Sequence, residues 1–225
     1  MTALALVCAR TLLKRGLTWA VVATAVVVAM AGVSLDLFGF DGAPSRSVGV
    51  VVGTFEIAGV LLAVGARLSG IASTRAGGFR AALVQTMGST RAELGVTSGA
   101  GIGAASAAGA GMLLVCVVYK CMSSEGLTYG SLVLTSAALL VEAAVAAAWA
   151  GLGARVGGPV AGAAVGLGAF VVARSGVALP IRACLPAPVP TGTADLFVAI
   201  GTGTLAVLGL VLVASALPAV GEEPS

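Results

Sequence analysis

Six long apolar segments, joined by short connections, dominate this chain and restrict it to a membrane fold. A transmembrane helix needs about 20 predominantly apolar residues to cross the hydrocarbon layer of a bilayer. The chain is 59% hydrophobic with a mean hydropathy of +1.11, which lies outside the range of soluble domains. We therefore expect an all-α, polytopic bundle that forms a single integral membrane domain over residues 1–225. The expected transmembrane segments are Leu17–Leu35, Val48–Ala66, Leu94–Val118, Tyr129–Gly151, Val156–Ala173 and Leu196–Leu217.

The distribution of basic residues predicts how this bundle is oriented. Lys and Arg accumulate in the short loops on the cytoplasmic side of a membrane. With six crossings, eight of the 12 basic residues fall on one side, which predicts that both termini are cytoplasmic, as in a protein of the bacterial plasma (inner) membrane. The net charge of +3 is then mostly an orientation signal and implies no nucleic-acid partner. The eight are Arg10, Lys14, Arg15, Arg67, Arg75, Arg80, Arg91 and Arg155; Arg46, Lys120, Arg174 and Arg182 fall on the other side.

The connection over residues 67–93 is the most polar part of the chain. It carries four arginines and a single acid, Glu93, and we expect it to form a cytoplasmic elbow. Phe79, Leu83 and Met87 recur at helical spacing, which predicts a short amphipathic helix along the membrane surface. Such an elbow suits contact with a soluble partner, through Arg80, Arg91 and Glu93; the simpler alternative is that the loop only sets orientation.

Residues 1–16 combine apolar and basic side chains. A basic stretch followed by Leu17–Val28 and the small residues Ala29 and Ala31 resembles a cleaved signal peptide. However, Leu4, Leu6 and other residues before Lys14 are themselves apolar. This pattern favours an interfacial helix that leads into a retained first transmembrane segment.

Small residues recur at four-residue steps in two of the segments, where they would lie on one helix face. Such ridges allow the backbone of a neighbouring helix to approach closely, although a chain with 33 glycines also produces the spacing by chance. We expect these glycines to mark tight helix packing: Gly99, Gly103, Gly111, Gly158 and Gly162.

Two acids, Glu56 and Glu142, lie within expected transmembrane segments. A charged carboxylate in hydrocarbon costs several kcal/mol, so each should face the interior of the bundle, a partner or water, or be protonated. One hypothesis is a proton relay. The alternative is hydrogen bonding to Ser, Thr or backbone groups, which is favoured because no third ionisable group aligns with the pair in the sequence.

The last external connection, residues 174–195, is rich in proline and therefore unsuited to continuous helix. Val177–Ile181 and Leu185 are apolar enough to form a short re-entrant turn. Cys121 and Cys184 fall in loops assigned to the outer side, where they either form a disulfide or remain separate small side chains.

Several kinds of catalytic and binding site are missing from the sequence. The chain has no histidine, no GxSxG and no phosphate-binding GxxxxGK[ST] motif, and its cysteines lack metal-site spacing. We expect no intrinsic enzyme activity, no cofactor and no metal.

The layout resembles the ABC-2 type membrane subunits of ATP-binding-cassette transporters. Ser89-Thr90-Arg91-Ala92-Glu93-Leu94 is similar to the S-R-x-[EQ]-[LI] stretch of that family's elbow, although the preceding proline and following lysine are absent. The resemblance implies a permease subunit of an exporter without an ATPase of its own. It also implies two kinds of partner: a cytoplasmic ATP-binding-cassette ATPase subunit, which would receive the elbow, and a second membrane subunit, identical or different.

Two other functions remain open. The chain could be a non-transporting scaffold or anchor subunit of a larger membrane complex, with the arginine loop acting only in orientation. It could instead be a proton- or ion-coupled carrier that uses Glu56 and Glu142, although the lack of detectable internal repeats disfavours this class.

Overall fold

The structure is a computed structural model that describes residues 2–37, 44–76, 86, 88–122, 129–175, 184–186 and 193–217. These residues form helices without any strand among them, as expected. In chain order the helices are α1 (Thr2–Leu13), α2 (Gly16–Leu37), α3 (Pro44–Ala76), α5 (Ser89–Met122), α6 (Tyr129–Arg174) and α7 (Thr193–Ala216).

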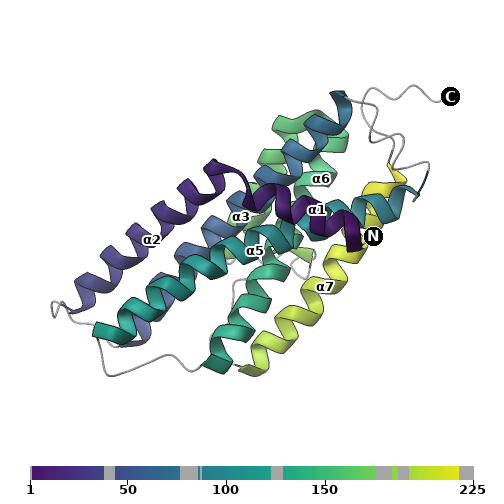
Figure 1. Ribbon diagram of the computed structural model, residues 1–225. Coiled ribbons are helices and arrows are strands. Elements are labelled where there is room, and N and C mark those ends of the chain that lie inside the picture. The colour runs from purple at the N-terminus through teal and green to yellow at the C-terminus, as the bar shows by residue number, and fades with distance from the viewer. Residues whose placement is uncertain are drawn as a thin grey trace.

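Five of the helices described are long and apolar enough to cross a membrane. Their apolar stretches are Gly16–Ser34, Gly49–Ser69, Ser89–Val118, Thr135–Arg174 and Asp195–Ala216. Figure 1 shows these helices running alongside one another, with the short helix α1 lying across the N-terminal half of α5. The prediction of an integral membrane bundle is confirmed at this level: the chain has several apolar helices of sufficient length.

The expected fourth and fifth transmembrane segments belong to one helical element, α6, which folds back on itself. Gly158 has φ 80° and ψ −173° and is followed by Pro159, so the helix is interrupted there. A Cβ atom on Gly166 would lie 2.9 Å from Cβ of Ala150, and one on Gly153 would lie 2.8 Å from Cβ of Val165. These contacts require two antiparallel arms, one on each side of Gly158. We call the end of the bundle where this turn lies the hairpin end.

Both ends of the described chain lie at the hairpin end. Near the end of α7, Ser215 accepts a 3.0 Å hydrogen bond from the hydroxyl of Thr90, at the start of α5. Leu4 on α1 contacts Gly95, one turn further along α5. The described chain therefore begins and ends at the hairpin end of the bundle.

The helix α1 packs its small residues onto the glycine ridge of α5. Ala5, Ala9 and Leu12 are buried, whereas Leu6 and Val7 are exposed on the opposite face. This division suits a helix with one face on the protein and the other among lipid headgroups and acyl chains.

The junction between α1 and α2 is closed by side chains of α2. The hydroxyl of Thr18 donates to the carbonyl of Leu12, and the indole N–H of Trp19 donates to the carbonyl of Leu13, at 2.7 and 2.8 Å. The last carbonyls of a helix have no partner within it, so these two bonds stabilise the bend. The position of α1 against the bundle thus depends on a specific connection to α2.

Candidate functional site

Charged side chains buried inside the bundle gather at two levels. The first group, which we call the hairpin-end ion pair, consists of Arg67, Glu93 and Arg155. The second, the intramembrane triad, consists of Glu56, Glu142 and Arg174. Glu56 and Glu142 lie about 16–20 Å from the hairpin-end ion pair along α3 and α6, at the rise of about 1.5 Å per residue of an α-helix.

The hairpin-end ion pair connects four helices. Glu93 at the start of α5 binds Arg67 of α3 through one oxygen and Arg155 of α6 through the other, the latter at 2.5 Å. Arg155 also donates to the carbonyl of Leu217, just beyond α7, at 2.9 Å. All three side chains are at least nine-tenths buried. Breaking a buried pair of this kind costs about 3–5 kcal/mol, since it leaves an uncompensated charge.

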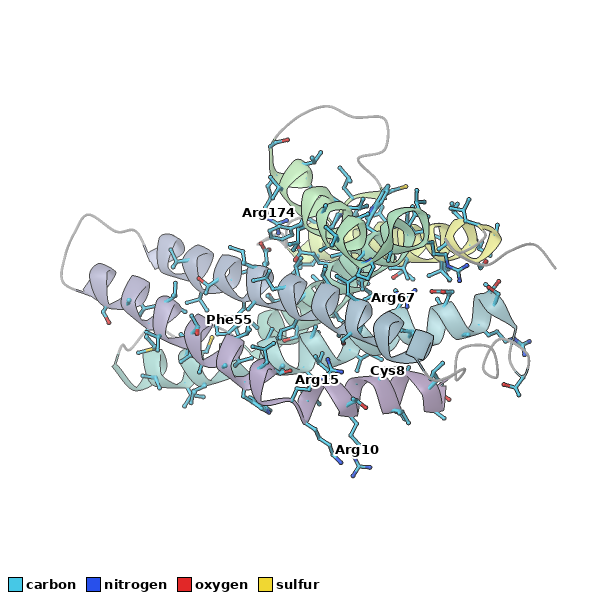
Figure 2. All side chains as sticks on the ribbon, turned by 90° about the horizontal axis from the view of Figure 1, so that it is seen from above. Cys8, Arg10, Arg15, Phe55, Arg67 and Arg174 are labelled. Atoms are coloured by element: carbon cyan, nitrogen blue, oxygen red, sulfur yellow. The ribbon has the colours of Figure 1, made fainter. Side chains whose placement is uncertain are left out.

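Cys8 on α1 lies near this group, and Figure 2 shows it close to Arg67. Burial raises the pKa of the Cys8 thiol, while the positive charge of Arg67 acts in the opposite direction. The thiol is therefore mostly protonated near neutral pH, as expected of a cysteine that packs rather than reacts.

This geometry changes the expected role of Glu93. The sequence suggests that Glu93 is a charge available to a partner, but its carboxylate is buried between two arginines. Of the other two residues expected to act in the elbow, Arg91 is exposed and Arg80 lies outside the described residues. The proposed amphipathic helix around Phe79 and Leu83 also falls outside them. The elbow is shorter than expected, because α3 continues to Ala76 and α5 already begins at Ser89.

The intramembrane triad brings two acids to one arginine. The guanidinium Nη2 of Arg174 lies 2.7 Å from Glu56 Oε2 and also binds Glu142 Oε1. The ring of Phe170, one turn earlier on α6, lies under the same guanidinium, 3.6 Å from centroid to Cζ. Figure 2 shows Arg174 on α6, away from Arg67 and Cys8.

Two sequence-based expectations are wrong here. The sequence predicts that Arg174 lies in the external loop, yet it is the last residue of α6 and its guanidinium binds the two acids. The two acids were expected to lack a third ionisable partner, and Arg174 is that partner. The fold-back at Gly158 explains both errors, because antiparallel arms place the end of α6 beside Glu142, far away in sequence.

The predicted external loop enters the bundle at one point. The indole N–H of Trp149 donates to the carbonyl of Cys184 at 2.7 Å, and Leu185 packs against Ala169 and Ala173. These contacts place Cys184 and Leu185 against both arms of α6, in the connection where the sequence predicts a re-entrant turn. Cys184 is a free thiol. Val177–Ile181 and the prolines at 180, 188 and 190 lie outside the described residues, whereas Cys121 belongs to the last turn of α5 rather than to a loop.

The glycines chosen for helix packing fall into two groups. Cβ atoms on Gly99 and Gly103 would meet the α1 backbone, at 2.6 Å from the Ala5 oxygen and 3.0 Å from Ala9 Cα. Gly111 and Gly162 are equally confined, against Phe55 and against the carbonyl of Ala150. Gly158 differs, because a Cβ there would meet nothing within 4 Å and its importance lies in its backbone conformation.

Comparison with protein-family models, with curated proteins and with solved structures finds no match. The candidate sites therefore rest on the geometry of this chain. Within the residues described, no group of three or more His, Cys, Asp or Glu side chains is placed to hold a metal ion.

Proposed function

We propose that the chain is the membrane-spanning permease subunit of an ATP-binding-cassette exporter of the ABC-2 type. A separate cytoplasmic ATPase would act on the elbow, and the bundle, paired with a second membrane subunit, would move in response. The observation that carries the proposal is the hairpin-end ion pair. It links the elbow, which joins α3 to α5, directly to α6 and α7.

This arrangement suits the transmission of force. Glu93 lies four residues into α5, so a displacement of the elbow would pull on Arg67 and Arg155 together. Because these groups are buried and mutually dependent, they favour movement of the four helices as a unit. Arg91, exposed two residues earlier in α5, is then the residue placed to contact the ATPase.

Other features are consistent with the proposal. The described ends of the chain, α1 and the end of α7, lie at the same end of the bundle, and the two arms of α6 bring the proposed number of crossings to six. The interfacial α1 matches the amphipathic N-terminal helix that the family resemblance implies. The lack of a phosphate-binding motif in the sequence agrees with an ATPase on another chain.

The test is affinity purification of the tagged full-length chain from its native membrane, followed by identification of bound nucleotide-binding subunits. We expect an ATPase subunit to co-purify with the wild-type chain, and its recovery to fall severalfold with Arg91→Glu. Arg10→Glu is the matched control, because Arg10 is also exposed, on α1, and carries the same charge change outside the elbow. Recovery with this control should equal that of the wild type.

Two results would overturn the proposal. If no nucleotide-binding subunit is recovered with the wild-type chain, the scaffold or the carrier function is favoured instead. If Arg91→Glu and Arg10→Glu reduce recovery equally, the effect is one of general charge and the elbow is not the contact.

A further inference from the structure

Two neighbouring helices of the bundle locate the boundary of the hydrocarbon layer at the junction of α1 and α2. The apolar stretch of α2 begins at Gly16, and that of α3 ends at Ser69. Arg15, immediately before the first of these stretches, donates from Nη1 to Oγ of Ser69 at 2.7 Å. The two boundaries therefore lie side by side, and Arg15 lies where the headgroup region of a surrounding bilayer begins.

Lys14 and Arg15 are exposed at this level, and their charges are not balanced by the protein. Within the described part of the chain neither side chain forms an ion pair, and the bond to Ser69 uses only one of the N–H groups of Arg15. Carbonyls at the end of α1 that could accept from them already accept from the side chains of Thr18 and Trp19. Both cations are therefore available to an anion from outside the chain.

The exposed face of α2 that continues from this junction is suited to an acyl chain. Leu17 and Val27 are 75% and 68% exposed, and helical spacing places Ala20 and Thr24 between them on the same face. The hydroxyl of Thr24 donates to the carbonyl of Ala20 at 2.9 Å, so it presents no unused donor to lipid. The exposed ring of Trp19 lies at the level where tryptophan is enriched in membrane proteins.

We propose that the junction of α1 and α2 binds the headgroup of an anionic phospholipid. Lys14 and Arg15 bind the phosphate, and an acyl chain of the same lipid lies along the exposed face of α2. A guanidinium donates two parallel hydrogen bonds to phosphate, and its contact with Ser69 holds it in place for this. Basic pockets beside transmembrane helices bind such headgroups. The site does not depend on the transport function proposed above.

Arg10 distinguishes a defined site from a general attraction between positive charge and the membrane. It is exposed one turn before Lys14. Figure 2 shows Arg10 projecting away from the bundle, whereas Arg15 lies on the side of α1 that faces α3. A defined site depends on Arg15 and on its contact with Ser69, whereas a general attraction depends on the number of charges and not on their positions.

The test uses the fluorescence of Trp19, which is one of two tryptophans in the chain. The full-length chain with Trp149→Phe is reconstituted into mixed vesicles of phosphatidylglycerol and phosphatidylcholine, in which one lipid or the other is brominated. Bromine quenches tryptophan on contact, so the ratio of the two quenching efficiencies gives the preference for anionic lipid beside Trp19. We expect a severalfold preference. If Trp149→Phe fails to fold, the difference between the wild type and Trp19→Phe gives the same quantity.

Four variants test which side chains form the site. Lys14→Gln and Arg15→Gln should each lower the preference about fivefold, the usual contribution of one basic side chain at an anionic surface. Arg10→Gln removes the same charge from the same helix and should leave the preference nearly unchanged. Ser69→Ala should lower the preference although it removes no charge, because Arg15 is then no longer held in position. Circular dichroism and gel filtration establish that each variant is folded.

The proposal is wrong if Trp19 in the wild-type chain shows no preference for phosphatidylglycerol. It is also wrong if Arg10→Gln lowers the preference as much as Arg15→Gln, or if Ser69→Ala leaves it unchanged, since either result indicates a general attraction. A preference that is lost when inorganic phosphate replaces chloride at equal ionic strength would assign the site to free phosphate rather than to a lipid.

Discussion

At the scale of single residues, Gly158 is the point at which α6 folds back on itself. Its φ of 80° and ψ of −173° fall in a region of backbone space that is essentially restricted to glycine. A side chain there would be strained although it has room, because no atom lies within 4 Å of a Cβ. The two arms of α6, and with them the approach of Arg174 to Glu142, depend on this conformation.

We therefore expect Gly158→Ala to lower the free energy of unfolding by about 1–3 kcal/mol, the cost of such backbone strain. The measurement is thermal or denaturant unfolding of the purified protein in detergent. Gly168→Ala is the control, since Gly168 lies on the second arm of α6 and a Cβ there also meets nothing within 4 Å. It should be neutral or slightly stabilising, because Ala favours helix over Gly. Equal stability of the two variants would contradict the strained turn.

The sequence predicts this residue for the wrong reason. The spacing of Gly158 and Gly162 suggests one packing ridge, but only Gly162 is in close contact. A positive φ cannot be recognised from the periodicity of apolar residues, although the following Pro159 does indicate that the helix is interrupted there. Glu56 and Glu142 were identifiable because acids are rare in apolar segments. Their partner Arg174 was not, since the pairing joins residues brought together only by the fold-back.

At the scale of helical elements, the contact between α1 and α5 tests whether the glycine ridge is more than composition. The Cβ of any larger residue at Gly103 would be 2.9 Å from Leu12 and 3.0 Å from Ala9 Cα, so the helices would have to separate. We expect Gly103→Leu to lower stability in detergent by about 1–3 kcal/mol, as overpacking does in other cores.

The matched control for this substitution is Gly209→Leu, in α7. Gly209 is exposed and a Cβ there would meet nothing within 4 Å, so the same side chain would enter lipid or detergent. Its unfolding midpoint should equal or exceed that of the wild type. A wild-type midpoint in Gly103→Leu would show that the contact tolerates bulk and that the ridge arises from glycine content alone.

Helical elements are also the scale at which sequence reasoning succeeds best. Long apolar runs predict the helices because the bilayer requires their backbone groups to be paired within each segment. The same runs say little about helix ends. Arg67 and Glu93 belong to helices rather than to the loop between them, because their mutual ion pair allows charged residues to continue α3 and α5 inside the bundle. A pairing of this kind cannot be seen until the tertiary structure is known.

At the scale of the whole molecule, the number of crossings decides how the two buried charge groups relate to the membrane. The second arm of α6, from Pro159 to Arg174, is about 24 Å long at the usual helical rise. This is shorter than the hydrocarbon layer of about 30 Å, so Arg174 would end its helix within the membrane rather than beyond it. If the chain makes the six proposed crossings with both termini cytoplasmic, the hairpin-end ion pair would lie toward the cytoplasmic surface and the triad closer to the outer one.

This arrangement predicts the topology of the chain. A reporter fused after Ser225 should behave as cytoplasmic, and so should one fused before Met1, because the described ends of α1 and α7 lie at the same end of the bundle. A reporter inserted after Ser124, in the connection between α5 and α6, should be external.

Paired alkaline phosphatase and fluorescent-protein fusions make the measurement, since the phosphatase is active only outside the cell membrane and the fluorescent protein only inside it. If α6 crossed the membrane once, the count would be odd and the two terminal reporters would report opposite sides. Such a result would remove the six-crossing arrangement, and with it the expectation that both termini are cytoplasmic.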